Sequence, residues 1–407
     1  MTSIRSLLLD GVVEPVGSAV QQSRRAVARL TAAGTQRSGA AVDGAVEALA
    51  ARGYGPARAL GADRDEIAPY VARSTFAVDG VFANREAAAM ADGPTLGTAL
   101  EMMRRPGRPS APIPVLTPHL PAAPAALAAT WLGHASVLVE IDGVQVLTDP
   151  VFSARCSPSQ TIGPKRMHKA PLTVGALPAI DVVLLSHDHY DHLDMTTIDA
   201  LSTLHPQAEF VVPIGVDAHL ISWGVDPGRI HAADWYERVT LTVRGTELRF
   251  HATAARHFSG RGLIRNLTQW VSWAVAGPEH RFFFSGDTGF TERYAETGDL
   301  FGPFDLTLIA VGAYDPAWPD IHVNPEEALS MHHLLNPGAA RDSLMLPIHW
   351  GTFNLALHPW ADPIQRLLTA AGTAGVGVVV PRPGGTADVI KRNGTAFDAP
   401  TWWEHCA

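Results

Sequence analysis

After residue 128 the chain alternates between short apolar runs and longer helical patterns. Two of the apolar runs, Ser136–Glu140 and Val144–Thr148, flank a turn at Asp142-Gly143 and predict a β-hairpin. A further run, Ile180–Leu185, has the composition of a buried strand. The same criteria predict strands at Phe210–Val212, Val239–Val243, Glu247–Ala252, Trp270–Val275, Arg281–Phe284, Leu306–Val311, Ser343–Ile348 and Val376–Val380.

Helical patterns separate several of these strands. Asn324–Leu335 predicts a helix with Asn324 as its N-cap and Pro325 at its first position, where proline is favoured. A second helix is predicted at Pro363–Ala371. Many strands with helices between them indicate an α/β architecture built in layers.

The first 128 residues follow a different pattern. Ala-rich stretches such as Ala40–Ala50 favour helix, and seven prolines between Arg104 and Pro124 predict an extended connector. This part carries 13 arginines, no lysine and 11 acidic residues, a net charge of +2 against −11 for the remainder. We therefore expect a helical N-terminal extension with a Pro-rich connector over residues 1–128, an α/β domain over 129–390 and a C-terminal tail over 391–407.

Composition narrows the class of protein. Of the 407 residues 46% are hydrophobic and 17% charged, which allows a sizeable core and excludes wholesale disorder. The net charge of −9 argues against nucleic-acid binding. The two cysteines, Cys156 and Cys406, exclude a disulfide framework and a cysteine-based zinc site.

Neither a membrane span nor a signal peptide is expected from the sequence. No run of 18 apolar residues occurs, and the short apolar run Leu7–Leu9 is interrupted by Asp10 and Glu14. The expected location is the cytoplasm, with peripheral contact to the inner face of the membrane as an open alternative.

The clearest chemical signal follows the strand that ends at Leu185. There His187, His189, Asp191 and His192 stand in the spacing His-x-His-x-Asp-His. Imidazole nitrogen and carboxylate oxygen are preferred zinc ligands, and a loop at a strand end can bring them to one point. The alternative is a histidine-rich surface loop, which does not explain the spacing or the strand before it.

Three further candidate ligands also follow predicted strands. They are His257, Asp287 and His349, and each stands among turn-forming residues. Alone, each is ambiguous, since a single histidine is more often a core or surface residue than a ligand. Together with the loop motif they supply enough ligands for two metal ions.

This order of ligands resembles the metallo-β-lactamase superfamily. Within it, the flanking sequence is most similar to N-acylphosphatidylethanolamine-hydrolysing phospholipase D, over about residues 75 to 385. Residues before about 75 and the segment His358-Pro359-Trp360, in a region that shapes the acyl side of the family's pocket, depart from the family pattern. The blocks that carry the resemblance are Thr130–Ala135, Leu147–Pro150, Ser157–Gln160, Gly163–Arg166, Ser186–Asp194, Phe282–Phe290, Phe301–Leu306, Gly312–Tyr314, His322–Ala328 and Ile348–Phe353.

The resemblance implies an αβ/βα four-layer sandwich with a hydrolase site at one edge and the N-terminal helical extension outside it. It implies a first metal held by His187, His189 and His257, a second held by Asp191, His192 and His349, and Asp287 as the bridge. The implied cofactor is two Zn²⁺, with iron or manganese as alternatives. The implied reaction is hydrolysis of N-acylphosphatidylethanolamine-like phospholipids to phosphatidic acid and N-acylethanolamine by a hydroxide that bridges the metals.

Three other residues are candidates for supporting roles. Asp149 is expected to orient the histidine ligands, although a carboxylate before proline is also common in turns. By the resemblance, His322 lies near the phosphate and assists the leaving group; the alternative is a surface histidine before a helix. Arg261 is expected to contact the substrate phosphate or simply to be solvated. His134 is expected to be structural.

Two other functions remain open on the sequence alone. One is a lactonase or another small-molecule metallo-hydrolase on the same fold, which would need a small polar pocket rather than an apolar channel. The other is a non-enzymatic, metal-binding protein that docks on membranes. Arginines at positions 24, 25, 29 and 37 are compatible with a basic amphipathic helix on an anionic membrane or with a helical cap. The expected substrate is a phospholipid or small phosphodiester, and the sequence carries no signal for the oligomeric state.

Overall fold

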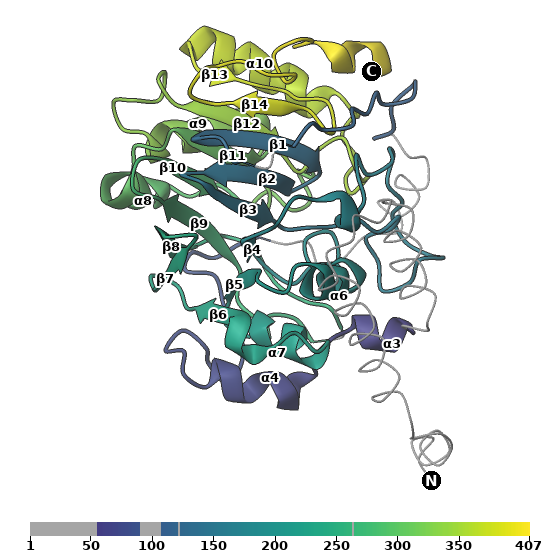
Figure 1. Cartoon of the computed structure of the whole chain (residues 1–407), viewed down its shortest axis with the longest axis vertical. Helices are drawn as coiled ribbons and strands as arrows, with labels where there is room; N and C mark the ends of the chain where they lie inside the picture. The colour runs from purple at the N-terminus through teal and green to yellow at the C-terminus, as the bar shows by residue number, and fades with distance from the viewer. Residues whose placement is uncertain (1–54, 90–106, 121–122, 263) are drawn as a thin grey trace.

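The computed structural model describes residues 55–89, 107–120, 123–262 and 264–407. Two seven-stranded sheets pack face to face, and helices cover their outer faces (Figure 1). The first sheet has the order β14-β1-β2-β3-β4-β5-β6 and the second β13-β12-β11-β10-β9-β8-β7. The predicted four-layer α/β sandwich is confirmed.

The first sheet consists of β1 (Leu127–Gly133), β2 (Ser136–Ile141), β3 (Val144–Thr148), β4 (Val182–Leu184), β5 (Glu209–Pro213), β6 (Ile230–Ala233) and β14 (Thr386–Asp388). The second consists of β7 (Arg238–Val243), β8 (Thr246–Ala254), β9 (Val271–Ala276), β10 (Arg281–Phe284), β11 (Leu306–Ala310), β12 (Leu344–Ile348) and β13 (Gly377–Val378). Helices α6 (Met195–Leu204) and α7 (Val216–Ser222) cover the first sheet, and α8 (Tyr294–Phe301), α9 (Pro325–Leu335) and α10 (Asp362–Ala374) cover the second. Helices α3 (Pro56–Ala59) and α4 (Arg64–Val71) precede the sandwich, and α4 packs against α7.

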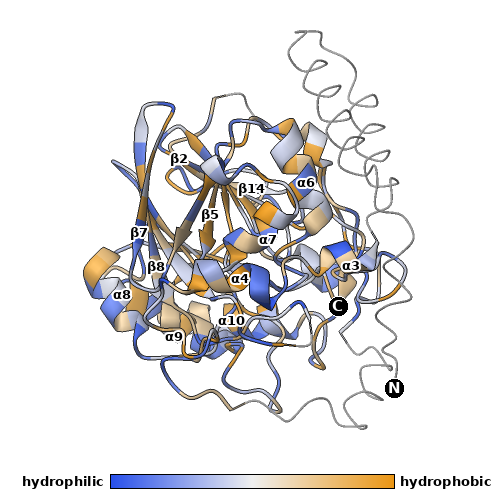
Figure 2. Ribbon diagram, turned by 90° about the horizontal axis from the view of Figure 1, so that it is seen from below, coloured by the Kyte–Doolittle hydropathy of each residue, from blue (hydrophilic) through white to orange (hydrophobic). Residues whose placement is uncertain are grey.

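The core between the sheets follows from the side-chain alternation of the strands. Along β2, Val137, Val139 and Ile141 belong to the central cluster between the sheets, whereas Leu138 belongs to the cluster that α6 and α7 cover. Both faces of such a strand are buried, which explains why its residues are apolar at successive positions. Hydrophobic residues accordingly gather along the strands inside the molecule, and hydrophilic ones colour much of the outer helices and loops (Figure 2).

All the predicted strands and both predicted helices of the sandwich are present, with shifted ends. Helix α9 has the expected Asn324 cap, whose side chain accepts a hydrogen bond from Glu327 N, and the expected first-turn proline. The predicted strand Val376–Val380 shrinks to the two residues of β13. The strands β6 and β14 and the helices α6, α7 and α8 were not predicted. The two strands have only four and three residues, which are too few to give a periodic signal.

The connector before the sandwich and the C-terminal segment are closely associated with the sandwich and with each other. The connector over residues 107–120 has no helix or strand and runs beside the C-terminal segments, where Ser110 N donates to Cys406 O (2.8 Å) and Leu116 N donates to Pro383 O (2.8 Å). The expected tail ends in a 3₁₀ turn, Trp402–Cys406, whose tryptophans are buried in the central cluster. The helix predicted at Ala40–Ala50 lies outside the described residues. Among the described residues, no helix is long and apolar enough to cross a bilayer.

Parallel strands set the position of the site. Strands β3 to β6 run parallel in the first sheet and β10 to β13 in the second. Their carboxyl ends carry Asp149 after β3, the loop His187–His192 after β4, Asp287 after β10 and His349 after β12. We call His187–His192 the metal loop.

Removal of one C-terminal tryptophan tests whether the last segment belongs to the core. Trp402 is 5% exposed, donates to Val380 O (2.9 Å) and packs on Trp350 and Trp360. Trp402→Ala should lower the free energy of unfolding by about 3–5 kcal/mol. Ile390→Ala is the control, because Ile390 is 51% exposed and should change stability by less than about 0.5 kcal/mol. Equal effects in chemical denaturation would show that the C-terminal segment adds nothing to the core.

Candidate metal centre

The first ligand group consists of three imidazoles whose nitrogens converge. His187 Nε2 lies 2.9 Å from His189 Nδ1, and His257 Nε2 lies 3.3 Å from the same atom. The rings of His187 and His257 are buried, and His189 is partly exposed. The two segments that carry them come from different sheets, so the group exists only when the sandwich is closed.

The second ligand group has the dimensions of a four-coordinate metal site. Asp191 Oδ2 lies 3.4 Å from His192 Nε2 and 3.3 Å from His349 Nε2. Asp287 Oδ2 lies 3.1 Å from each of the same two nitrogens. Ligands about 2.0 Å from a tetrahedral ion stand roughly 3.3 Å apart, so these four atoms surround a position that such an ion fits.

One carboxylate faces both groups. Asp287 Oδ2 also lies 3.9 Å from His187 Nε2 and 3.7 Å from His257 Nε2, so a single oxygen adjoins four of the five ligand imidazoles. The structure therefore brings all seven sequence-predicted ligands together and puts Asp287 between the two sets of three.

Unpaired atoms show that the cluster suits bound cations. His192 Nε2 and Asp287 Oδ1 are buried and have no hydrogen-bond partner in the described part of the chain, although a buried polar atom without a partner is costly. Burial alone would raise the pKa of Asp287, but the imidazoles of His192 and His349 hold it well below its usual range. An ionised carboxylate among converging imidazole nitrogens is the donor set that divalent metals bind once the rings release their protons.

Left-handed backbone conformations help to turn the ligands inward. Asp149, His349 and His134 have φ values of 29°, 63° and 55°, which L-residues rarely adopt. Gly286, next to the bridging carboxylate, has φ of 53°, and a Cβ there would lie 2.4 Å from Ser186 Cβ. Such strain is held by the surrounding structure and is frequent at functional sites.

Asp149 orients two ligands at once. Its Oδ2 lies 2.6 Å from His192 Nδ1 and accepts a hydrogen bond from Ser186 Oγ (2.5 Å), which in turn lies 2.9 Å from His187 Nδ1. With the Nδ1 atoms used in this way, the Nε2 lone pairs of both rings point into the cluster. The carboxylate also accepts Ser186 N (2.8 Å) and so fixes the start of the metal loop.

His257, another histidine ligand of the first group, is fixed from its other side. The ring of His257 makes a 2.9 Å hydrogen bond from Nδ1 to Ile321 O, which leaves Nε2 free for the cluster. Its main chain is bonded on both sides by Asn84, which accepts from His257 N (3.0 Å) and donates to His257 O (2.7 Å). Asn84 gave no signal in the sequence, because the contact spans 173 residues.

His134 was expected to be structural, and it contacts one of the candidate ligands directly. Its Nε2 lies 2.9 Å from Asp191 Oδ2, and its backbone N donates to Thr352 Oγ1 (2.7 Å). Its carbonyl accepts from His349 N (3.1 Å) and so ties the β1–β2 turn to the end of β12. Burial lowers the pKa of His134 to about 3, so the ring is neutral near pH 7 and donates one hydrogen bond to the ligand carboxylate.

His322 lies at the rim of the cluster. Its Nδ1 is 3.9 Å from Asp287 Oδ2, its ring packs near those of His257 and His349, and its side chain is 12% exposed. Burial lowers the pKa of His322 to about 4, which makes the ring neutral at neutral pH.

Arg261 does not lie among the ligands. Its side chain is buried, and its guanidinium donates hydrogen bonds only to main-chain carbonyls, those of Ala59, Asp188 and Leu193. Arg261 also lines the wall of a cavity beside the metal loop, so the expected contact with a substrate phosphate stays a prediction.

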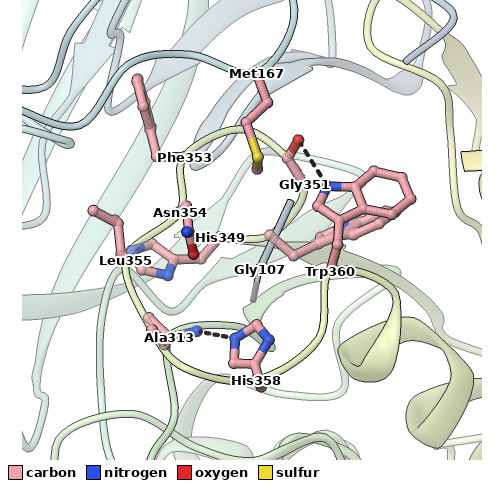
Figure 3. A pocket seen from close by; sticks show the side chains of 12 residues that line it. Gly107, Met167, Ala313, His349, Gly351, Phe353, Asn354, Leu355, His358 and Trp360 are labelled. Carbon is pink, nitrogen blue, oxygen red and sulfur yellow. Dashed lines mark hydrogen bonds between the residues drawn. The ribbon is translucent and has the colours of Figure 1, made fainter. Parts of the chain in front are cut away.

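Two cavities adjoin the metal loop and His349. A recess of about 20 Å³ beside His349 is closed by the loop that carries His358 and Trp360 (Figure 3). Ala313 N donates to His358 Nε2 (3.0 Å), and a Cβ on Gly107 of the connector would lie 2.3 Å from Asn354 Oδ1. The recess has room for about one water molecule and none for an acyl chain.

The larger cavity is a groove of about 710 Å³ that borders the metal loop at Tyr190 and extends to Asp194, just after the loop. Its wall includes Phe152, Met195 and the serine-rich segment Ser157–Gln160. The volume is in the range of small-molecule binding sites.

Comparison with known proteins agrees with this geometry. Residues 145–350 match the β-lactamase superfamily domain. The chain belongs to the metallo-β-lactamase superfamily. It is 48% identical, over 82% of its length and 90% of the relative's, to an uncharacterized protein of Mycobacterium tuberculosis.

One further relative and one solved structure are similar to this chain. The chain is 39% identical over 256 residues to N-acyl-phosphatidylethanolamine-hydrolyzing phospholipase D 1 of Caenorhabditis elegans. This match covers 60% of the chain and 70% of the relative. The structure of isothiocyanate hydrolase from Delia radicum gut bacteria has a TM-score of 0.50 at 19% identity, over 64% of this chain and 97% of that one. The latter shows a shared fold. The chain is thus a metal-dependent hydrolase of the superfamily, as the sequence predicted.

Substitution of the shared carboxylate tests the ligand assignment. Protein from zinc-supplemented medium should contain about two metal ions per chain. Asp287→Asn should retain about one or fewer and lose at least about 100-fold in hydrolytic activity, because the substitution weakens both groups.

The matched control is His332→Asn. His332, in helix α9, is also buried, but it forms hydrogen bonds with Thr307 Oγ1 and Ala340 O, away from the ligands. The metal content of His332→Asn should therefore stay at the wild-type value. Metal content is measured by plasma mass spectrometry. Full occupancy in Asp287→Asn would rule out the bridging role.

Proposed function

We propose that this hydrolase is a phosphodiesterase of phospholipase D type that cleaves N-acylphosphatidylethanolamine-like phospholipids to phosphatidic acid and N-acylethanolamine. The observation that carries the proposal is the pair of ligand groups around Asp287, in a chain that is 39% identical to a phospholipase D over 256 residues. Two zinc ions are the proposed cofactor, since histidine and carboxylate ligands at tetrahedral spacing suit zinc.

A bound metal pair supplies an activated water and neutralises the charge of a phosphate. The chain's own residues then hold the substrate and its charge. His322, neutral and at the rim, can donate one hydrogen bond to a phosphate oxygen. His134 and Asp149 hold Asp191 and His192 still, so that the site does not have to reorganise during the reaction.

The groove of about 710 Å³ supports a substrate larger than a simple lactone. Phe152, Tyr190 and Met195 offer apolar surface, and the serines of Ser157–Gln160 offer hydroxyl groups for a polar head group. Because the recess beside His349 is nearly filled, we propose that the groove receives the lipid.

A comparison of substrates tests the proposed function. The metal-loaded protein should hydrolyse N-acylphosphatidylethanolamine in mixed micelles, with phosphatidic acid and N-acylethanolamine as products in mass spectrometry. A soluble chromogenic diester should be cleaved more slowly, since it leaves the groove unused. Asp287→Asn, purified in parallel, controls for contaminating enzymes. Faster hydrolysis of lactones than of any phosphodiester would instead identify a lactonase on this fold.

We also propose that the enzyme reaches its substrate by weak peripheral docking through the basic N-terminal part of the chain. The part concerned, residues 1–52, lies outside the described residues, and the proposal rests on the arginines in it. Each basic residue near an anionic surface contributes about 1 kcal/mol. Deletion of residues 1–52 should reduce co-sedimentation with anionic vesicles at low salt and reduce lipid turnover, while cleavage of the soluble diester stays unchanged. Vesicle binding that survives the deletion would contradict this role, and loss of both activities would indicate a structural cap.

A further inference from the structure

The buried guanidinium of Arg261 connects the metal loop to residues 56–62, which we call the N-terminal segment. Nη1 donates to Asp188 O (2.6 Å) and to Leu193 O (2.7 Å), which stand near the two ends of the metal loop. Nε and Nη2 both donate to Ala59 O (3.1 and 2.7 Å) at the end of helix α3. One planar side chain therefore fixes three carbonyls from two segments that lie far apart in the sequence.

Aromatic rings hold the guanidinium in place. It lies over the ring of Tyr190 at 4.1 Å and over that of Trp223 at 5.0 Å. The hydroxyl of Tyr190, a residue of the metal loop, donates back to Arg261 O (2.7 Å). Trp223 donates to Arg58 O (2.9 Å), and Arg58 donates to Trp223 O (3.0 Å), so the same tryptophan also binds α3.

A second connection joins the N-terminal segment to the metal loop through His219. Its Nδ1 accepts a hydrogen bond from Ala62 N (3.0 Å), and its Nε2 lies 3.5 Å from Asp188 Oδ2. The Asp188 carboxylate also accepts Gly260 N (2.7 Å) and Thr268 Oγ1 (3.0 Å). Gly61 makes this approach possible, because a Cβ at that position would lie 2.3 Å from His219 Nδ1.

We propose that Arg261 and residues 56–62 form a clamp that fixes the metal loop in the conformation that binds metal. Residues 56–62, which lie in the part of the chain that departs from the family pattern, then support the metal centre. The physical reason is preorganisation: a loop that is already ordered does not have to lose conformational freedom when its ligands bind. Arg261 acts through the main chain of the loop and is a positioning residue.

The first test compares two arginines with similar surroundings. Arg229 also donates to main-chain carbonyls, those of His205, Ala208 and Ser202, and lies over the ring of Phe210 at 5.5 Å, away from the metal loop. Arg261→Gln should weaken zinc binding by about 10- to 100-fold, the range found when residues that support ligands are removed. Arg229→Gln should leave zinc affinity unchanged, whatever its effect on stability.

The second test compares two glycines and leaves Arg261 intact. Gly61 and Gly80 have similar left-handed φ values of 77° and 74°, but a Cβ on Gly80 would have no atom within 4 Å. Gly61→Ala should displace the segment from His219 and lower zinc affinity, whereas Gly80→Ala adds the same backbone strain and should not. This pair also keeps the proposal open to refutation if Arg261→Gln fails to fold.

Both tests use full-length protein and read metal binding directly. Zinc affinity is measured by competition with a chromophoric chelator, ligand geometry by the visible spectrum of the Co²⁺-loaded protein, and stability of the metal-free protein by thermal unfolding. A lower affinity together with a changed Co²⁺ spectrum in Arg261→Gln and Gly61→Ala alone supports the clamp. Wild-type affinity and spectrum in these variants, with only reduced stability, would overturn it. The result is independent of the substrate, so failure of the proposed phospholipase activity leaves it unaffected.

Discussion

Five imidazoles and two carboxylates lie together at one edge of this sandwich. Burial of these polar groups costs free energy unless each has a hydrogen-bonding or charged partner. The shared oxygen of Asp287 offsets part of the cost, because it adjoins four ring nitrogens at 3.1 to 3.9 Å. Two of the atoms that have no hydrogen-bond partner among the described residues, His192 Nε2 and Asp287 Oδ1, belong to these candidate ligands and point to a cation as the missing partner. The rest of the site consists of the residues that keep this cluster in position.

Those supporting residues come from segments that lie far apart in the sequence. Asp149 follows β3, His134 lies in the β1–β2 turn, Asn84 precedes the first sheet and Arg261 follows β8. Several of them act on main-chain atoms rather than on the ligand side chains. A metal centre built in this way depends on the closure of both sheets, so global stability and metal binding are coupled.

The fold alone does not determine the reaction, because the superfamily scaffold supports many chemistries. What differs among such enzymes is the space beside the metals. In this chain the recess at His349 holds about one water, while the groove at Tyr190 measures about 710 Å³. The segment around His358 and Trp360, which departs from the family pattern, lines and narrows the first space.

The sequence by itself determined the layered α/β fold and the set of ligands. Strands buried on both faces leave continuous apolar runs, and ligands at strand ends leave a fixed local spacing, as in His187–His192. Tertiary structure alone decided which residues support the ligands. Asn84 and His257 are 173 residues apart, and Arg261 meets Ala59 across 202. Hydrogen bonds between main-chain and side-chain atoms at such separations leave no periodic trace in a single sequence. Folding buries Arg261 between the metal loop and Ala59, a position that no local pattern in the sequence indicates.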